Sequence, residues 1–232
     1  MTDPRAVAII TGASRGIGEA IANALAEDGF NLAICARSAS DIEATRQSIL
    51  AKNSDVHIYS AALDVQDEEK VQKFVQEASS LGPIEVLVNN AGLYTHGTSG
   101  ISGSAFREML ETNTLAPHLF TQIVIEEMKA RRRGHIFNIA SICGKEAYPD
   151  VGAYCASKYA LVGYSSALDQ EVAQFGVKVT ALCPSWVNTE LAKNSPVPAE
   201  KRIQPTDLAN AIRYVMTLSP GARVRELTIH CG

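Results

Sequence analysis

Long apolar runs are missing from this sequence. No stretch approaches the ~20 consecutive apolar residues that a membrane-spanning helix requires. The first residues, MTDPRAVAIITG, contain neither the basic segment nor the small-residue cleavage site of a secretory signal peptide. We therefore expect a soluble, cytoplasmic protein that does not bind membranes.

Metal-binding cysteine motifs are missing as well. The five cysteines, at positions 35, 143, 155, 183 and 231, form no CxxC pair and show no zinc spacing. The histidines, cysteines and carboxylates also lack the spacing of metal ligands. We expect free thiols in a reducing compartment and no bound metal.

An excess of positive charge is missing too. Lys and Arg number 21 against 25 Asp and Glu, which gives a net charge of −4. The one basic run, at 131–133, is typical of the last turn of a helix, where positive charge complements the helix dipole. A nucleic-acid surface needs clustered Lys and Arg, so no nucleic-acid partner is predicted.

The sequence does have enough apolar residues for one large core. It contains 232 residues, of which 46% are hydrophobic. A chain of this length and composition needs no second domain to bury its apolar surface. We expect residues 1–232 to form a single domain.

Short apolar runs alternate with longer amphipathic stretches. The apolar runs predict seven strands, at 6–11, 31–36, 56–63, 84–90, 135–141, 177–183 and 226–230. The stretches between them predict helices near 16–28, 40–53, 67–81, 103–132, 152–175 and 206–218. Because these strands lack polar alternation, they should be covered on both faces. The predicted fold is α/β: a doubly wound Rossmann sheet of seven parallel strands with helices on both faces.

The turn after the first predicted strand is rich in glycine. In open α/β sheets, ligands bind beyond the carboxyl ends of the strands. The turn reads TGASRGIG, and Gly12, Gly16 and Gly18 open the next helix. Backbone can approach a pyrophosphate closely there, and a helix N-terminus favours negative charge. This placement favours a dinucleotide cofactor over a simple turn.

The turn after the second predicted strand favours NADP (NADPH) over NAD. Ala36 and Arg37 stand where NAD-binding proteins offer a carboxylate to the ribose. Arg37, together with Arg15, could instead bind a 2′-phosphate through its planar guanidinium group. After the third strand, Asp64 either accepts a hydrogen bond from the adenine amino group or caps the following helix. The sequence leaves both uses of Asp64 open.

The segment YCASKYALVGY, at 154–164, is rich in tyrosine. On a helix, Tyr154 and Lys158 lie four residues apart and share a face, whereas Tyr159 and Tyr164 project in other directions. By itself, such a pair is typical of an aromatic ring packed against a lysine stem. Neighbouring motifs decide whether the pair also has a chemical role.

Five motifs, in this order along nearly the whole chain, resemble those of the short-chain dehydrogenase/reductase family. TGASRGIG is similar to the TGxxxGxG cofactor loop, NNAG at 89–92 to the end of the fourth strand, and YCASK to the YxxxK active site. Asn113 in ETNTLAP matches the family's active-site asparagine, and Ser141 in NIAS matches its catalytic serine. In motif detail the chain is most similar to 3-oxoacyl-carrier-protein reductases.

The resemblance implies hydride transfer between a nicotinamide and a carbonyl or secondary alcohol. In this mechanism Tyr154 is the acid, Ser141 hydrogen-bonds the substrate oxygen, and Lys158 holds the cofactor ribose. Asn113 would anchor a water chain that resupplies the proton. A free phenol has a pKa of ~10, so the positive charge of Lys158 is expected to lower the pKa of Tyr154.

The resemblance also implies a set of cofactor contacts. These are Gly12, Ser14, Arg15, Gly16, Ile17, Gly18, Arg37, Asp64, Val65, Asn90, Ala91, Gly92, Tyr154, Lys158, Pro184, Val187 and Thr189.

Two features depart from the family pattern. In CPSWVNTE, Ser185 replaces the glycine that usually follows Pro184, so a Cβ stands where close backbone approach was expected. The segment 188–205, which closes over substrate in this family, is brief. A short segment suggests an open cleft for a bulky or carrier-bound carbonyl, or equally a loose specificity.

The predicted function is NADP-dependent reduction of a carbonyl group or oxidation of an alcohol, with a 3-oxoacyl thioester as one substrate class. Small ketones, sugars or other secondary alcohols are the alternative substrates. A non-catalytic NADP-sensing protein on the same fold is a further alternative. Tyr159 and Tyr164 are assigned to core packing or to the interface of a homodimer or homotetramer.

Overall fold

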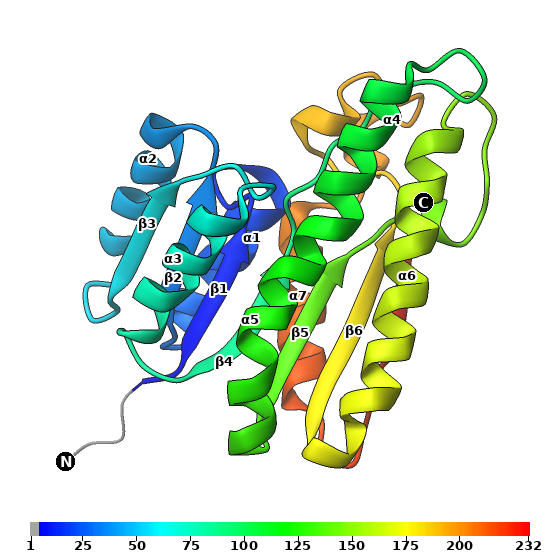
Figure 1. Cartoon of the computed structure of the whole chain (residues 1–232). Helices are drawn as coiled ribbons and strands as arrows, with labels where there is room; N and C mark the ends of the chain where they lie inside the picture. Colours follow the sequence, from blue (N-terminus) through cyan, green and yellow to red (C-terminus); the bar gives the residue numbers. More distant parts are fainter. Residues whose placement is uncertain (1–4) are drawn as a thin grey trace.

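The computed structural model of the chain describes residues 5–232 as one parallel sheet between two layers of helices (Figure 1). The strands are β1 (Val7–Thr11), β2 (Asn31–Ala36), β3 (Ile58–Ala62), β4 (Ile84–Asn89), β5 (Gly134–Ile139), β6 (Val177–Pro184) and β7 (Glu226–Ile229). The helices are α1 (Gly16–Glu27), α2 (Ala39–Leu50), α3 (Glu68–Ser79), α4 (Gly103–Leu110), α5 (Ala116–Arg131), α6 (Gly152–Val172) and α7 (Pro205–Thr217). The predicted doubly wound fold is confirmed.

The strands lie in the order β3-β2-β1-β4-β5-β6-β7, and all neighbouring pairs are parallel. The order reverses between β1 and β4, because β2 and β3 continue to one side and β4 to β7 to the other. Connections leave this point in opposite directions, which opens a crevice at the carboxyl ends of the strands.

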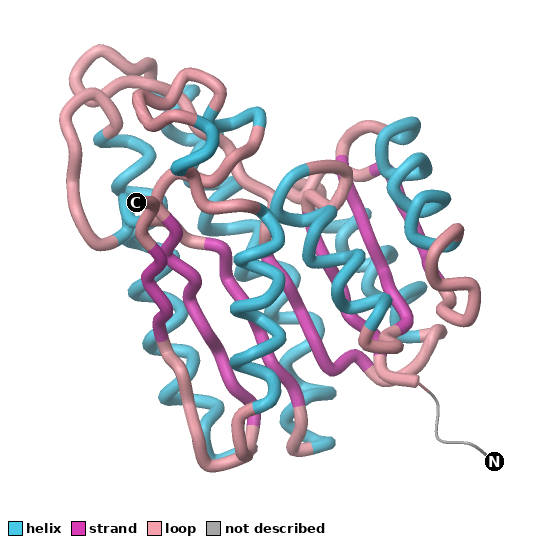
Figure 2. Tube along the Cα trace, turned by 180° about the vertical axis from the view of Figure 1, so that it is seen from behind, coloured by secondary structure: helices cyan, strands magenta, loops and turns pink. Residues whose placement is uncertain are grey.

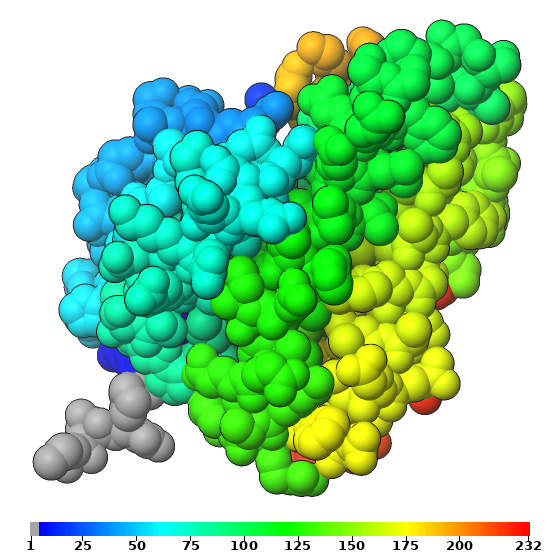
Figure 3. All heavy atoms as spheres, viewed as in Figure 1, coloured from blue at the N-terminus to red at the C-terminus, as the bar shows by residue number. Residues whose placement is uncertain are grey.

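Each face of the sheet has its own apolar core. On one face, α1, α2 and α7 pack Ile21, Ile42 and Ile212 against β1 and β2. On the other, α3, α5 and α6 cover the sheet with residues such as Phe74 and Phe120. Figure 3 shows this second layer as spheres, and Figure 2 shows the chain from behind. Burial on both faces explains why the strands are apolar throughout.

The predicted helical stretch near 103–132 is present but contains an irregular turn. The single helix expected over 103–132 is interrupted by a π-helical turn, Glu111–Leu115, between α4 and α5. Pro117 lies in the first turn of α5 and has no N–H to donate to the carbonyl of Asn113, four residues earlier. The extra residue of the π turn accommodates this missing hydrogen bond, and turns of this kind are frequent at functional sites.

Helix α6 carries buried polar residues on its inner face. The Nδ2 group of Asn89 donates to Oδ1 of Asn138 at 2.8 Å, and Nδ2 of Asn138 donates to Oγ of Ser165 at 2.8 Å. This chain of bonds connects β4, β5 and α6. It fixes α6 against the sheet, because buried amide groups are costly to leave unpaired.

Within residues 5–232, every helix is too short or too polar to cross a membrane.

Candidate active site

The glycine-rich turn after β1 is packed too closely for side chains. Gly12 and Gly16 have φ angles of +64° and +61°, a region that favours glycine. A Cβ on Gly12 would lie 2.9 Å from Cα of Ala91, and a Cβ on Gly18 would overlap the carbonyl oxygen of Gly12. The turn therefore presents bare backbone at the N-terminus of α1, in a form suited to a pyrophosphate.

Thr11 and Asn90 hold this turn against the end of β4. The hydroxyl oxygen of Thr11 accepts hydrogen bonds from the backbone N–H groups of Asn90 and Ala91, both at 3.0 Å. The side-chain amide of Asn90 donates to the carbonyl oxygens of Thr11 and Gly12 at 2.9 and 3.0 Å. Thr11 cannot be recognised from the sequence, because a threonine at a strand end carries no distinctive signal of its own.

The two arginines predicted to read a 2′-phosphate are both exposed. Arg15 immediately precedes α1, and Arg37 directly follows β2, the neighbour of β1. Both therefore stand at the carboxyl edge of adjacent strands. Ser14 and Ile17 belong to the same turn, and the carbonyl of Ser14 accepts a hydrogen bond from Thr45 on α2.

The residues after β3 serve different purposes. Asp67, not Asp64, caps α3, because its carboxylate accepts the backbone N–H of Lys70 at 3.1 Å. The capping role considered for Asp64 is therefore wrong: its carboxylate instead accepts the N–H of Gln66 in a local turn. The side chain of Val65 is buried in the core.

Asn113 is fully buried in the π turn and fixes the loop after β4. Its Oδ1 accepts the backbone N–H of Leu93 at 2.7 Å, and its Nδ2 donates to the Leu93 carbonyl and to Oγ of Ser157. A Cβ on Gly92 would lie 3.3 Å from Oδ1 of Asn113 and 3.8 Å from Nζ of Lys158. Asn113 thus ties the NNAG segment to α6.

Tyr154 and Lys158 share the inner face of α6, as predicted. Both are buried, and Nζ of Lys158 lies 5.7 Å from the ring centroid of Tyr154. The ammonium group donates to the Ile139 carbonyl at the end of β5 at 2.8 Å. Ser141, two residues beyond β5, is also buried, and its hydroxyl favours the ionised form of the Tyr154 phenol. The structure therefore brings the serine, tyrosine and lysine together.

The pKa of Tyr154 was expected to be lowered, and for the protein without a bound cofactor this expectation is wrong. Burial raises the pKa of the Tyr154 phenol, and the hydroxyl of Ser141 only partly offsets this effect. Burial also lowers the pKa of Lys158, to about 8. Tyr154 consequently keeps its proton at neutral pH, which is the form a proton donor requires.

The segment after β6 closes the other side of the crevice. Pro184, the last residue of β6, and Val187 are buried, and a Cβ on Gly16 would lie 3.0 Å from Cγ2 of Thr189. The hydroxyl of Ser185 accepts the backbone N–H of Cys231 at 2.7 Å. The extra side chain at Ser185 therefore holds the segment after β7.

The other tyrosines of α6 lie apart from this cluster. Tyr159 is 44% exposed, and its hydroxyl donates to the Lys145 carbonyl. Tyr164 is half-buried, and its hydroxyl lies 3.2 Å from Nδ1 of His118 on α5. All five cysteines are free, as predicted, and Cys35, Cys155 and Cys183 are buried.

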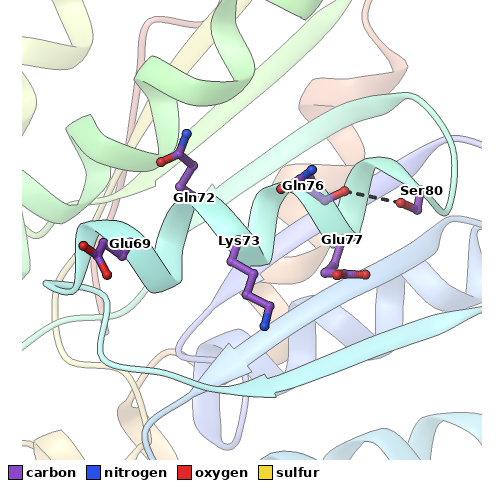
Figure 4. Close-up of a pocket in the computed structure, with 6 residues that line it drawn as sticks. All are labelled: Glu69, Gln72, Lys73, Gln76, Glu77 and Ser80. Atoms are coloured by element: carbon purple, nitrogen blue, oxygen red, sulfur yellow. Dashed lines mark hydrogen bonds between the residues drawn. The ribbon is translucent and has the colours of Figure 1, made fainter.

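A surface pocket elsewhere on the molecule shares no residue with this cluster. It runs along α3 (Figure 4) and is lined by Glu69, Gln72, Lys73, Gln76, Glu77 and Ser80. Its polar side chains all come from one helix and the residue after it.

Within residues 5–232, no three His, Cys, Asp or Glu side chains are grouped so that they could hold a metal ion.

Comparison with known proteins decides the family. The short chain dehydrogenase family model matches residues 6–199. This chain belongs to the short-chain dehydrogenase/reductase family. It is therefore an oxidoreductase that acts on CH–OH or carbonyl groups.

Relatives and solved structures of the family cover nearly the whole chain. A farnesol dehydrogenase from Aedes aegypti is 33% identical over 96% of this chain and 94% of its own. A betaketoacyl-ACP reductase structure from Bacteroides thetaiotaomicron is 35% identical, with a TM-score of 0.86, over 99% of this chain and 97% of its own. An alcohol dehydrogenase structure from Thermococcus sibiricus, complexed with 5-hydroxy-NADP, is 33% identical, with a TM-score of 0.88, over 97% of this chain and 96% of its own.

Proposed function

We propose that this chain is an NADPH-dependent ketoreductase whose catalytic residues are Asn113, Ser141, Tyr154 and Lys158. The observation that carries the proposal is the buried cluster of Tyr154, Ser141 and Lys158 at the carboxyl ends of the strands, beside the glycine-rich turn. A sensor that only binds nucleotide would not need a protonated phenol there.

The residues present fit an NADP cofactor. The cradle of Gly12, Gly16 and Gly18 leaves no room for side chains, and backbone at a helix N-terminus suits a pyrophosphate. When bound, NADPH supplies the hydride. The residues proposed to hold it are Gly12, Ser14, Arg15, Gly16, Ile17, Gly18, Arg37, Asp64, Val65, Asn90, Ala91, Gly92, Tyr154, Lys158, Pro184, Val187 and Thr189.

The side chains of the cluster have separate tasks in the proposed reaction. Tyr154 donates its phenolic proton to the substrate carbonyl oxygen, while Ser141 donates a hydrogen bond to that oxygen and stabilises the charge that develops on it. Lys158 binds the ribose hydroxyls and provides positive charge near the phenol. Asn113 holds the loop after β4 and anchors the water chain that returns a proton to the site.

The Arg37→Ala variant is expected to lose affinity for NADPH while it keeps its affinity for NADH. A lost charge-assisted contact with the 2′-phosphate costs about 1 to 3 kcal/mol, or roughly 5- to 150-fold in Kd. Titration of the protein with each nucleotide, followed by tryptophan fluorescence, measures the Kd of NADPH and the Kd of NADH. Lys52→Ala serves as the charge-matched control, because it removes an exposed cation just after the end of α2. An equal loss toward NADH would show that Arg37 does not read the phosphate.

The proposed substrate is a ketone, and a 3-oxoacyl thioester is supported by the similarity to the ketoacyl reductase structure. The test is NADPH consumption by the wild-type protein with an acetoacetyl thioester, small ketones, sugars, quinones and steroids. Turnover on any of these carbonyls supports the ketoreductase function. Tight NADPH binding with no turnover across this panel would favour the sensing role instead.

We also propose that residues 1–232 act as one cytoplasmic domain that assembles into a homodimer or homotetramer. The exposed Tyr159 on α6 is consistent with a contact between copies, because tyrosine is enriched at protein interfaces.

A further inference from the structure

The loop after β4 is fixed at both ends beside the candidate active site. At one end, Leu93 exchanges two hydrogen bonds with the buried side chain of Asn113. At the other, the N–H of Gly97 donates to the Asp150 carbonyl at 2.6 Å, and Oγ1 of Thr98 accepts the N–H of Gly152 at 2.9 Å. Residues 94–96 are therefore held in place next to the start of α6, the helix that carries Tyr154.

Tyr94 meets Tyr154 directly. The two rings pack edge to face with centroids 5.1 Å apart, an arrangement that aromatic pairs favour. Tyr94 is half-buried, so part of its side chain is accessible. Burial raises the pKa of Tyr94, so its phenol is neutral at physiological pH.

His96 supports Tyr94 from the outer side. Its Nε2 atom lies 3.2 Å from the Tyr94 hydroxyl, and the two rings meet edge to face at 5.1 Å. His96 itself is exposed. The three rings form a row that leads from the surface to Tyr154, with Tyr94 in the middle.

The loop before α6 is hydrogen-bonded to the loop after β4, and it carries another aromatic ring and a net negative charge. Tyr148 is 41% exposed, and its hydroxyl donates to Glu146 at 2.7 Å. The loop also contains Asp150, while its one lysine, Lys145, is ion-paired with Glu226 at 2.7 Å. Because Gly97 and Thr98 bond to this segment, a substrate group beside Tyr94 would lie near its net negative charge, which disfavours an anionic group.

We propose that Tyr94 is a specificity-determining residue that contacts the substrate beside its carbonyl group, and that His96 positions it. The group that fits is flat, uncharged and apolar, so the preferred substrate is a ketone with an aromatic ring next to the carbonyl. This inference rests on the proposed ketoreductase function and names its substrate class.

The test compares two neutral methyl ketones, acetophenone and 2-butanone, with NADPH as the second substrate. Tyr94→Ala is expected to lower kcat/KM for acetophenone by about 10- to 100-fold, mainly through a higher KM, because the ring loses its aromatic contact. For 2-butanone the change is expected to stay below about 3-fold. The Kd of NADPH, measured by fluorescence, should not change.

Two further variants test the part played by His96. His96→Ala is expected to raise KM for acetophenone more in the wild-type background than in Tyr94→Phe, because that variant has already lost the hydroxyl bonded to His96 and keeps only the ring contact. Thr95 lies between Tyr94 and His96 in the sequence and is exposed. Thr95→Ala is therefore the matched control and should behave as the wild type.

The specificity assignment fails alone if the wild-type protein reduces ketones but Tyr94→Ala lowers kcat/KM equally for both. It also fails alone if the wild-type protein prefers 2-butanone or an acetoacetyl thioester to acetophenone. If the wild-type protein binds NADPH but reduces no carbonyl compound, the proposed function fails, and the substrate assignment fails with it.

Discussion

Tyr154→Phe is expected to lower kcat/KM for carbonyl reduction by about 10²- to 10⁴-fold, the range that a positioned general acid contributes. The phenylalanine ring can keep the edge-to-face contact with Tyr94 and the place beside Lys158. Only the hydroxyl that delivers the proton is lost. The Kd of NADPH should therefore stay within about 2-fold of the wild-type value.

The matched control for this prediction lies on the same helix. Tyr159→Phe removes a hydroxyl that donates to the Lys145 carbonyl, outside the Tyr154 cluster. It should retain wild-type turnover. Steady-state kinetics with a carbonyl found in the substrate panel, together with NADPH titration, measure both variants. Normal turnover in Tyr154→Phe would refute the assignment of Tyr154 as the acid.

Gly18→Ala is expected to weaken NADPH binding by roughly 5- to 150-fold, which corresponds to the 1–3 kcal/mol typical of an overpacked site. The new Cβ would overlap the Gly12 carbonyl oxygen and would lie 2.5 Å from Nδ2 of Asn90. The glycine-rich turn must then move away from the end of β4, where Asn90 and Thr11 hold it. Isothermal titration with NADPH measures the loss.

Gly163→Ala is the control for the glycine substitution. It adds the same methyl group to a helical position with no neighbouring atom within 4 Å, so neither binding nor folding should suffer. Thermal unfolding without NADPH shows whether Gly18→Ala still folds. A folded Gly18→Ala protein with wild-type NADPH affinity would contradict the placement of the cofactor at this turn.

The fold could be predicted because its signals are local and mutually consistent. Strands buried on both faces need continuous apolar sequence, and the crossovers between them need helices. Both patterns are visible without knowledge of tertiary contacts, and the structure confirms all seven strands. Tyr154 and Lys158 could be placed together for the same reason, because helix geometry alone puts residues four apart on one face.

The π turn around Asn113 was not predicted, because a single π turn within a long helical stretch has no distinctive sequence pattern. Pro117 was the available signal, since proline lacks the N–H that would bond to a carbonyl of the preceding turn. The contribution of Thr11 was missed for a different reason. Its hydroxyl acts on Asn90 and Ala91, 79 and 80 residues later in the chain, and no local pattern reports such a contact.

The pKa of Tyr154 was predicted in the wrong direction because the sequence shows neighbours but not burial. Lys158 was known to be one turn away, which favours a lower pKa. The structure buries the phenol and directs the ammonium group to the Ile139 carbonyl, so desolvation dominates. The ring contacts of Tyr94 with His96 and Tyr154 could not be predicted either, because they depend on the folded loop after β4.

Hydride transfer from NADPH to a carbonyl carbon can be followed with an isotope label. The wild-type protein is incubated with a ketone and NADPH that carries deuterium at both positions of nicotinamide C4, and the alcohol is analysed by mass spectrometry and NMR. One deuterium is expected at the former carbonyl carbon, with little or no product from Tyr154→Phe. An alcohol without deuterium at that carbon, or NADPH binding without any alcohol, would contradict it.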